Sequence, residues 1–303
     1  MIVPEREGAG MHGVMVVNGF LQSGKFTEIY EWLSVAAHRQ GISLSVQTNA
    51  QIPARADCAE ILNNGLLKDA DFILFWDKDV FLARTLEAAG FRLFNCADAI
   101  GACDHKAETF FRLRGSGIRM PQTILIPQTF HNIGYTELSF LEDIENQLKY
   151  PFVMKECFGS FGAQVYLAGN HEDAVDILKK TEGRPVICQE FIKESAGRDI
   201  RINMVGGRAV ATMMREHDSD FRANVTNGGK MKKYSPTLEQ IRMAEKVCSL
   251  LKLDFGGVDI LFGTDGEPIL CEVNSNAHFK NIFDCTGINV ADAIMEHIRE
   301  EIH

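Results

Sequence analysis

Three oxygen-bearing side chains near the C-terminus have the spacing that points most directly to chemistry. Asp259, Glu272 and Asn274 lie in two apolar runs, FGGVDILF and PILCEVN, which are separated by the turn-forming residues GTDGE. This pattern predicts a β-hairpin, and a turn centred between Asp265 and Gly266 places Asp259 directly opposite Glu272. Directly opposed residues share one face of a sheet, with Cβ atoms roughly 5 Å apart. Asn274 shares that face because side chains alternate along a strand.

The strands around these side chains are apolar, so we expect the two carboxylates to be buried and to need a cation nearby. Two carboxylates and an amide offer only oxygen ligands, which suit a hard cation such as magnesium shared with a phosphorylated substrate. Asp259, Glu272 and Asn274 are therefore the predicted metal ligands. The alternative is a pair of solvated carboxylates on the open face of an antiparallel sheet.

Composition limits the classes of protein to which the chain can belong. Its 303 residues are 46% hydrophobic, which is enough for two or more buried cores. A formal charge of -10 argues against a general binder of nucleic acid or of anionic membranes. The eight cysteines are scattered and form no CxxC pair, which argues against a zinc ribbon or a thioredoxin-like site. Free thiols and the lack of a membrane-length apolar run predict a soluble, cytoplasmic protein.

The order of apolar runs predicts how the chain is divided. Residues 1–12 are predicted to be a flexible arm, and residues 13–103 alternate the strand-like runs VMVV, LSVQTN, DFILFWD and FRLFN with amphipathic helices. Such alternation predicts an α/β domain with a parallel sheet and helices on both faces. A linker helix within 104–122 should lead to two α+β subdomains with mostly antiparallel sheets, over 123–192 and 193–303.

A glycine loop near the N-terminus nearly matches the phosphate-binding loop of P-loop enzymes. Gly19 to Phe26 reads GFLQSGKF, follows a strand and opens a helix, and Asp77 ends a later apolar strand where a magnesium-binding acid would stand. The required hydroxyl is missing at Phe26, and Thr27 lies about 100° round the helix. We therefore favour a strand-to-helix loop whose backbone N–H groups hold an anionic substrate group. A P-loop kinase or ATPase using Gly19 to Lys25 is the alternative function.

Lysines beside glycines form a second candidate for phosphate binding. Lys155 lies in the apolar run PFVMKE and is followed by CFGSFGAQ, in which Gly159 and Gly162 flank Ser160. A strand lysine followed by a flexible glycine loop can hold phosphate oxygens while the loop closes over them. A lysine whose stem is buried beside an ordinary hairpin loop is the alternative. Lys106 lies at the start of the linker helix. An exposed lysine is ordinary on a helix, so this position alone does not indicate a function.

Polar residues then follow in three short segments. QEFIKE comes after an apolar strand and could offer its backbone to an adenine ring. Asp199, Arg201 and Asn203 alternate along DIRINMV, which a Gly-Gly turn joins to RAVATMM in a two-residue hairpin. The segment FRAN places Arg222 and Asn224 in a polar loop. A sheet with one polar face lies over a binding site or over water, and each segment alone leaves both readings open.

The order of these segments resembles that of the ATP-grasp carboxylate–amine ligases, most closely the RimK-type branch. The similar segments run from Asp104 to Ile302 and are DHK, VMKECFGSFG, QEFIKESAGRDIR, DFRANVTNGG, GVDIL and EVNSN. The resemblance implies an α/β pre-ATP-grasp, Rossmann-like N-terminal domain, followed by an α+β ATP-grasp fold of two subdomains.

The same resemblance implies ATP as a substrate, with two Mg²⁺ ions for which Mn²⁺ could substitute. The residues it assigns to ATP are Lys106, Lys155, Ser160, Gly162, Glu190, Phe191, Ile192, Lys193, Asp199 and Asn224. It assigns Arg222, with Arg201, to catalysis, where a guanidinium would stabilise charge on the transferring phosphoryl group and on the tetrahedral oxyanion. It assigns the metal to the same three residues that the hairpin brings together.

The reaction implied is the formation of an amide bond. A substrate carboxylate attacks the γ-phosphorus of ATP, and an amine then attacks the acyl phosphate, releasing phosphate after ADP. The amine would belong to a glutamate-like amino acid, and the carboxylate to a peptide, carrier protein or small molecule. An ATP-grasp kinase acting on a hydroxyl group is a further alternative, and the family implies a homo-oligomer.

One stretch departs from the family pattern. Many RimK-type proteins continue after EVN with a Ser-Pro-Gly turn, whereas this chain reads NSNAHFKNIF, which is more similar to the branch acting on carrier-bound amino-acid intermediates. His278 and Lys280 in this stretch could contact an acceptor carboxylate or could simply be surface residues. The departure affects the predicted substrate more than the ATP chemistry.

Overall fold

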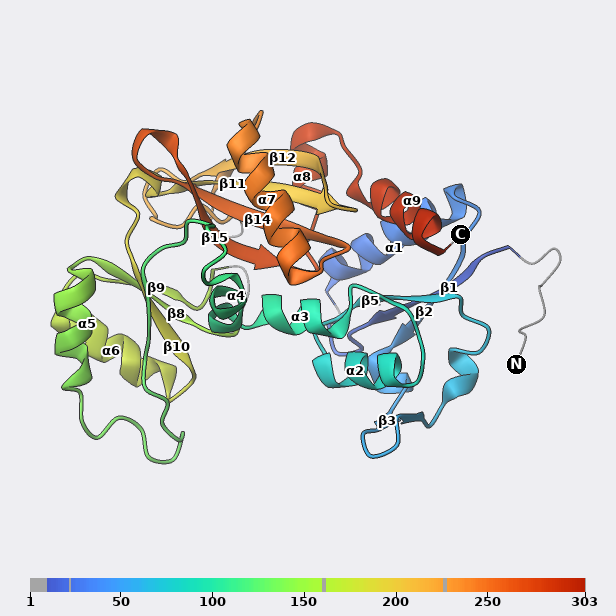
Figure 1. Cartoon of the computed structure of the whole chain (residues 1–303), viewed down its shortest axis with the longest axis horizontal. Helices are drawn as coiled ribbons and strands as arrows, with labels where there is room; N and C mark the ends of the chain where they lie inside the picture. The colour runs from blue at the N-terminus through green and yellow to red at the C-terminus, as the bar shows by residue number, and fades with distance from the viewer. Residues whose placement is uncertain (1–9, 22, 160–161, 226–227, 303) are drawn as a thin grey trace.

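The computed structural model describes residues 10–21, 23–159, 162–225 and 228–302 (Figure 1). Most of the predicted N-terminal arm lies outside the described residues, and its last residue, His12, already begins the first strand. Within the described part, no helix is both long enough and apolar enough to cross a membrane.

The N-terminal sheet is parallel, with strand order β2-β1-β5-β6. Its strands are β1 (His12–Val17), β2 (Ser43–Thr48), β5 (Phe72–Trp76) and β6 (Leu93–Phe94). Alternate side chains of β1 face opposite sides, so Met15 joins the apolar cluster of Leu33 on α1 (Gly24–Arg39), whereas Val14 joins that of Leu86 on α2 (Val80–Ala88). The parallel pairing and the helices on both faces are as predicted. A short ladder of β3 (Ala54–Arg55) with β4 (Glu60–Ile61) lies beside this sheet.

Two helices, rather than one, lead out of the N-terminal sheet. The sequence predicts a single linker helix from Asp104, but α3 (Ala97–Asp104) and α4 (Lys106–Leu113) meet at His105, whose backbone is extended. The ring of His105 accepts a hydrogen bond from Glu108 N and so caps α4. This break puts Lys106 at the first position of α4, directed toward the loop after β8.

The glycine loop is carried by a four-stranded antiparallel sheet of order β7-β10-β8-β9. Its strands are β7 (Thr123–Leu125), β8 (Phe152–Glu156), β9 (Val165–Ala168) and β10 (Val186–Glu190). Phe152 and Met154 pack under α5 (Phe140–Leu148) and α6 (His171–Thr181), so the residues between and after them, Val153 and Lys155, point to the opposite face.

The C-terminal sheet is antiparallel, with order β13-β12-β11-β14-β15. Its strands are β11 (Arg198–Val205), β12 (Arg208–Glu216), β13 (Lys230–Lys233), β14 (Phe255–Phe262) and β15 (Pro268–Asn274). α7 (Leu238–Leu251) packs on one face of this sheet, α8 (Lys280–Thr286) packs against β12 and β13, and α9 (Val290–Ile302) packs against α1 (Figure 1). The mostly antiparallel second half is as predicted.

Strand β12 is longer than the sequence indicates. The predicted run RAVATMM ends at Met214, whereas β12 continues to Glu216 and pairs with β13, which lies beyond the polar loop that contains Arg222. The turn between β11 and β12 is the predicted two-residue Gly-Gly turn, but a register shift follows it between Asn203 and Met204. Beyond this bulge Asp199 pairs with Arg215, a pairing that a regular hairpin would not produce.

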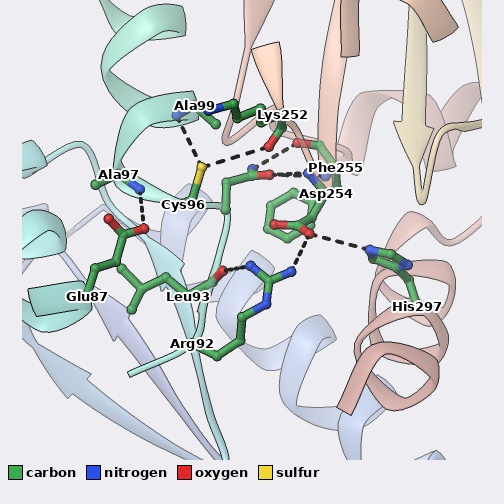
Figure 2. A network of polar contacts seen from close by, with 11 residues as sticks. Glu87, Arg92, Leu93, Cys96, Ala97, Ala99, Lys252, Asp254, Phe255 and His297 are labelled. Carbon is green, nitrogen blue, oxygen red and sulfur yellow. Dashed lines mark hydrogen bonds and ion pairs between the residues drawn. The ribbon is translucent and has the colours of Figure 1, made fainter. Parts of the chain in front are cut away.

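Polar contacts lock the N-terminal sheet to the C-terminal sheet. Asp254 forms ion pairs with Arg92 at 3.0 Å and with His297 at 3.7 Å (Figure 2). The buried Asn95 donates to the carbonyls of Phe255 and Ser275. These contacts hold the start of β14 and the end of β15 against the N-terminal sheet, so that the loops after β1 and β5 face the end of β15.

Candidate functional site

Two neighbouring cavities share one wall. The inter-sheet cavity, of about 100 Å³, lies between the two antiparallel sheets, and the junction cavity, of about 350 Å³, lies between the C-terminal and N-terminal sheets. The residues that define the first include Val153, Lys155, Gln189, Glu190, Phe191, Ile192, Asp199, Arg222, Asp259 and Cys271. Those that define the second include Asn18, Lys25, Tyr30, Trp76, Asp77, Arg201, Asn274, Asn276 and His278. Arg215, Asn224 and Glu272 line both cavities.

The predicted acidic pair is directly opposed, as the hairpin pattern indicates. Asp259 on β14 pairs with Glu272 on β15, and Asn274 pairs two positions farther along with Gly257. The pairing passes through a bulge, because Ile260 pairs with Leu270 and leaves Cys271 without a cross-strand partner in the ladder. Asp259 lines the inter-sheet cavity, Asn274 lines the junction cavity, and Glu272 lies where the two meet.

Arginines supply positive charge at Asp259, where the sequence led us to expect a magnesium ion as the compensating cation. Arg201 Nε and Nη2 donate to the two Asp259 oxygens at 2.7 and 2.6 Å, and Arg215 Nη2 lies 2.9 Å from Asp259 Oδ2. Arg215 also donates through Nε and Nη2 to Asp199, both at 2.7 Å. These four side chains form a buried ion cluster because Asp199 pairs with Arg215, and Arg201 with Asp259, across neighbouring strands. Bidentate guanidinium–carboxylate pairs of this kind are strong and geometrically specific.

Arg215 is the residue of this cluster that sequence reasoning missed. Its side chain is only 4% exposed and lines both cavities. Counting back from the Gly-Gly turn without a bulge would place Met214 opposite Asp199, so the position of Arg215 depends on one extra residue in β12. No local pattern in RAVATMMRE predicts that bulge.

The pKa values of the two carboxyl groups in the cluster are shifted in opposite directions. Burial raises the pKa of Asp199, which one guanidinium contacts. Burial acts in the same direction at Asp259, but the charges of Arg201 and Arg215 outweigh it and lower the pKa of that carboxyl. Asp259 is therefore ionised at neutral pH.

Both predicted phosphate lysines are buried beside the shared wall. Lys155 Nζ lies 4.0 Å from Cys271 Sγ, and Lys106 Nζ donates to the carbonyl of Gly159 at 3.3 Å. Burial lowers the pKa of Lys106, while the nearby charge of Glu272 acts in the opposite direction. The predicted contact Ser160 lies outside the described residues, whereas Gly162 lines the inter-sheet cavity.

Arg222 connects the polar loop after β12 to the glycine loop after β8. Its Nη2 pairs with Asp220 Oδ2 at 2.7 Å, and its Nη1 donates to the carbonyl of Gly162 at 2.9 Å. Arg222 also lines the inter-sheet cavity, and Asn224 lines both cavities. The predicted glycine loop and the polar loop after β12 therefore contact each other through this arginine.

The segment after β10 forms one end of the inter-sheet cavity. Glu190, Phe191 and Ile192 line it as predicted, whereas Lys193 is exposed and does not line it within the described part of the chain. Sequence reasoning considered only the backbone here and missed the side chain of Gln189. This side chain is 1% exposed, and its Oε1 has no hydrogen-bond partner in the described structure.

The glycine loop after β1 faces the junction cavity. Lys25 and Phe26, at the start of α1, both line it, and so does Asp77 at the end of β5. Burial and the nearby charge of Arg201 lower the pKa of Lys25. The described residues of the segment that resembled a P-loop thus line the junction cavity together with Arg201, and none of them lines the inter-sheet cavity.

His278 and Lys280 have different surroundings. His278 lines the junction cavity, and its Nε2 lies 3.0 Å from the carbonyl of Lys25. Lys280 instead pairs with Asp284 at 3.1 Å and does not line the junction cavity among the described residues. Of this predicted pair, only His278 is placed to contact a ligand there.

Two facing antiparallel sheets, with Lys155 on one and the carboxylates of Asp259 and Glu272 on the other, are typical of an ATP-grasp fold. D-alanine–D-alanine ligase from Bacillus anthracis, solved in complex with ATP, superposes with a TM-score of 0.72 over 96% of this chain and 97% of that chain, at 17% identity. The family model of the RimK-like ATP-grasp domain matches residues 104–298. The chain therefore belongs to the RimK-like ATP-grasp family, which confirms the resemblance seen in the sequence.

Curated relatives share this region. β-Citrylglutamate synthase B from Danio rerio is 34% identical over 226 residues, covering 73% of this chain and 54% of the relative. N-acetylaspartylglutamate synthase A from Homo sapiens is 33% identical over 223 residues, covering 73% of this chain and 56% of the relative. The chain thus spans about half the length of these two relatives. The matches do not favour the P-loop interpretation of the N-terminal glycine loop.

Proposed function

We propose that this protein is an ATP-dependent carboxylate–amine ligase that forms an amide bond and releases ADP and phosphate. The observation that carries the proposal is the position of Glu272. This carboxylate lines both cavities, so a metal–triphosphate held in the inter-sheet cavity would present its terminal phosphate to a substrate in the junction cavity. Transfer of a phosphoryl group across that shared wall needs no covalent bond to the protein.

The inter-sheet cavity fits a nucleotide. Gln189 Oε1 is a buried acceptor without a hydrogen-bond partner in the described structure, and it is suited to the exocyclic amine of adenine. Leaving a buried acceptor without a donor is energetically unfavourable, and a hydrogen bond from the ligand would remove that penalty. Glu190, Phe191 and Ile192 border the base. Asp199 would meet the nucleoside, and Lys155 with Lys106 would lie at the phosphate end, where their buried charge compensates that of the triphosphate.

The shared wall fits a divalent metal. Asp259 already accepts three hydrogen bonds from arginines, and a carboxylate has about four acceptor positions, so one remains. The side chain of Glu272 makes no hydrogen bond or ion pair with any other described residue, so all of its acceptor positions are available to a metal ion. Glu272 and Asn274 would therefore be the main ligands of Mg²⁺ and Asp259 the third, with two ions, replaceable by Mn²⁺, as the family implies. When bound, the metal would supply positive charge that stabilises the phosphate groups of the nucleotide.

The protein's own residues would then act by charge and position. A substrate carboxylate in the junction cavity attacks the γ-phosphorus, forming an acyl phosphate and ADP; an amine attacks the acyl carbon and phosphate leaves. Arg222, with Arg201, would stabilise the charge that develops on the phosphoryl group and on the tetrahedral oxyanion. Contact between Arg222 and the glycine loop would help to exclude water, which would hydrolyse the acyl phosphate.

The substrates proposed follow from the named relatives and from the cavity. Both relatives are synthases of glutamate conjugates by name, so the amine substrate would be glutamate or a similar amino acid. The carboxylate would belong to a small molecule, a peptide or a carrier protein. A cytoplasmic location and a homo-oligomeric assembly remain part of the proposal.

An ADP-release screen of amino acids against candidate carboxylates tests this function. We expect release to require both substrates, and mass spectrometry should find a product joined by loss of one water. Lys155→Ala should raise the KM for ATP at least tenfold, and Lys25→Ala should leave it unchanged. The reverse result would establish the P-loop alternative, and ADP release with a phosphorylated product but no need for an amine would establish a kinase.

A further inference from the structure

Asp77 is a buried carboxylate that the proposed reaction does not yet use. It ends β5, is 6% exposed and lines the junction cavity. Its oxygens accept hydrogen bonds from Asn18 Nδ2 at 3.1 Å and from the backbone N of Lys78 at 2.7 Å. Among the described residues, no cationic side chain lies within ion-pair distance of it, since the nearby Lys78 is paired with Asp104 at 2.6 Å.

A carboxylate in this position is incomplete without a cation. Burial raises the pKa of Asp77, and the like charges of Asp79 and Asp104 act in the same direction. A buried anion of this kind is stabilised most by a cation that arrives with a ligand. The two neutral donors that contact it, Asn18 Nδ2 and Lys78 N, could donate equally well to an asparagine oxygen. These two hydrogen bonds therefore do not account for the negative charge at this position.

Cationic side chains line the same junction cavity. Lys25 and Arg201 are among its lining residues, and burial together with the charge of Arg201 lowers the pKa of Lys25. The buried atoms Asn276 Oδ1 and His278 Nδ1 have no hydrogen-bond partner in the described structure and add unmet polar capacity to the same cavity. A ligand that completes this cavity therefore carries both a cationic and an anionic group.

We propose that Asp77 binds the ammonium group of the amine substrate, and that the junction cavity selects a free amino acid whose carboxylate faces Lys25. The proposal rests on the ligase function above and specifies its amine substrate. At about 350 Å³ the cavity lies at the small end of ligand pockets, which suits one amino acid beside the carboxylate to be activated. Asn276 connects the two parts of the site, because its Nδ2 donates to the Asp77 carbonyl from a position two residues beyond Asn274.

Asp77→Asn tests the proposal, since asparagine keeps the shape and can still accept from Lys78 N. Using L-glutamate as the probe in the ADP-release assay, we expect the KM for the amino acid to rise about 10- to 100-fold, as for loss of a hydrogen bond to a charged group, with the KM for ATP unchanged. Asp79→Asn is the matched control: it removes the same charge two residues away, where the side chain caps α2, and should behave as the wild type. An unchanged KM in the Asp77 variant would overturn the proposal.

Calorimetric binding without ATP separates this inference from the ligase function. The wild type should bind L-glutamate but not N-acetyl-L-glutamate, which lacks the ammonium charge, and Asp77→Asn should lose the difference. Amino-acid binding that depends on Asp77, without ADP release for any substrate pair, would support the site and refute the ligase. Failure of the wild type to bind L-glutamate or any other protein amino acid would refute the site. Far-UV circular dichroism of both variants verifies that they are folded.

Discussion

Replacing Arg215 with methionine should reveal how strongly the buried ion cluster depends on one side chain. Arg215 is the only residue in ion-pair contact with Asp199 among the described residues, whereas Asp259 would keep Arg201. Removing one partner of a buried pair typically destabilises a protein by about 3–5 kcal/mol, because a charge is left without compensation. Methionine retains most of the apolar volume, so the loss would report charge rather than a cavity.

Protonation of Asp199 sets an upper limit on this electrostatic loss. A carboxyl group with an unfolded-state pKa of about 3.9 can be neutralised at pH 7 for roughly 4 kcal/mol, and at pH 5 for roughly 1.5 kcal/mol. Burial already raises the pKa of Asp199 in the wild type, and loss of the Arg215 charge would raise it further, so the native state of the variant loses more stability as the pH rises. The loss relative to the wild type should therefore grow from pH 5 to pH 7, with upper limits of about 1.5 kcal/mol at pH 5 and about 4 kcal/mol at pH 7.

Urea unfolding of the two proteins between pH 5 and pH 7 measures this difference. Adding Asp199→Asn to Arg215→Met removes the buried carboxylate that has lost its partner. The part of the stability loss that changes with pH should then disappear. Arg39→Gln, which breaks an exposed pair between Arg39 and Asp292, should cost less than about 1 kcal/mol at either pH. A pH-independent loss below about 1 kcal/mol for Arg215→Met would refute the view that this arginine compensates a buried carboxylate.

Three other substitutions test separate parts of the structure. Glu272→Gln should raise the Mg²⁺ concentration for half-maximal activity at least tenfold while changing urea stability by less than about 1 kcal/mol, because this partly exposed side chain makes no ion pair or hydrogen bond with the described residues and interacts with the charge of Lys106 only at longer range. Gly159→Ala should lower the free energy of unfolding by about 1–3 kcal/mol and raise the KM for ATP, because Gly159 has a φ of 135° and an added Cβ would collide with Gln164 Oε1. Gly115→Ala is the control: Gly115 has a φ of 74°, and an added Cβ would meet open space. This variant should lose less stability and keep the wild-type KM. Burial lowers the pKa of His278 below its ordinary value of 6.5, so the stability that neutral His278 supplies is complete above that pH and declines below it. Urea unfolding of His278→Gln from pH 8 to pH 5 should show a smaller decline than the wild type, and an equal decline would contradict this assignment.

Features set by local patterns could be predicted from the sequence. The parallel N-terminal sheet and the hairpin that opposes Asp259 to Glu272 follow from apolar periodicity and turn-forming residues, which act over a few neighbours. The family and the ATP-grasp fold followed from the order of short segments. Helices α3 and α8 were not predicted because both are short and lie between stronger signals.

Features set by docking of distant segments could not be predicted. Lys25 and Asp77 were noticed as a possible P-loop pair, but their presence in one cavity with Arg201 depends on how the N-terminal sheet is held against the start of β14. That contact runs through Asn95 and Asp254, neither of which stands in a recognisable motif. Likewise, no local pattern indicates that Lys193 is exposed and does not line the inter-sheet cavity of the described structure, because that cavity forms only where the two antiparallel sheets face each other.

The bulge at Cys271 explains how one strand serves both a core and a site. Leu270 and Val273 belong to the apolar cluster under α7, and strict alternation from Leu270 would carry Glu272 into that cluster as well. The extra residue lets Cys271 and Glu272 both line the inter-sheet cavity, while Val273 returns to the core. Glu272 therefore reaches the wall between the cavities because β15 departs from regular pairing at that point. The hairpin symmetry seen in the sequence gave the correct opposed pair, but the bulge is what makes that pair compatible with a buried core on the other face.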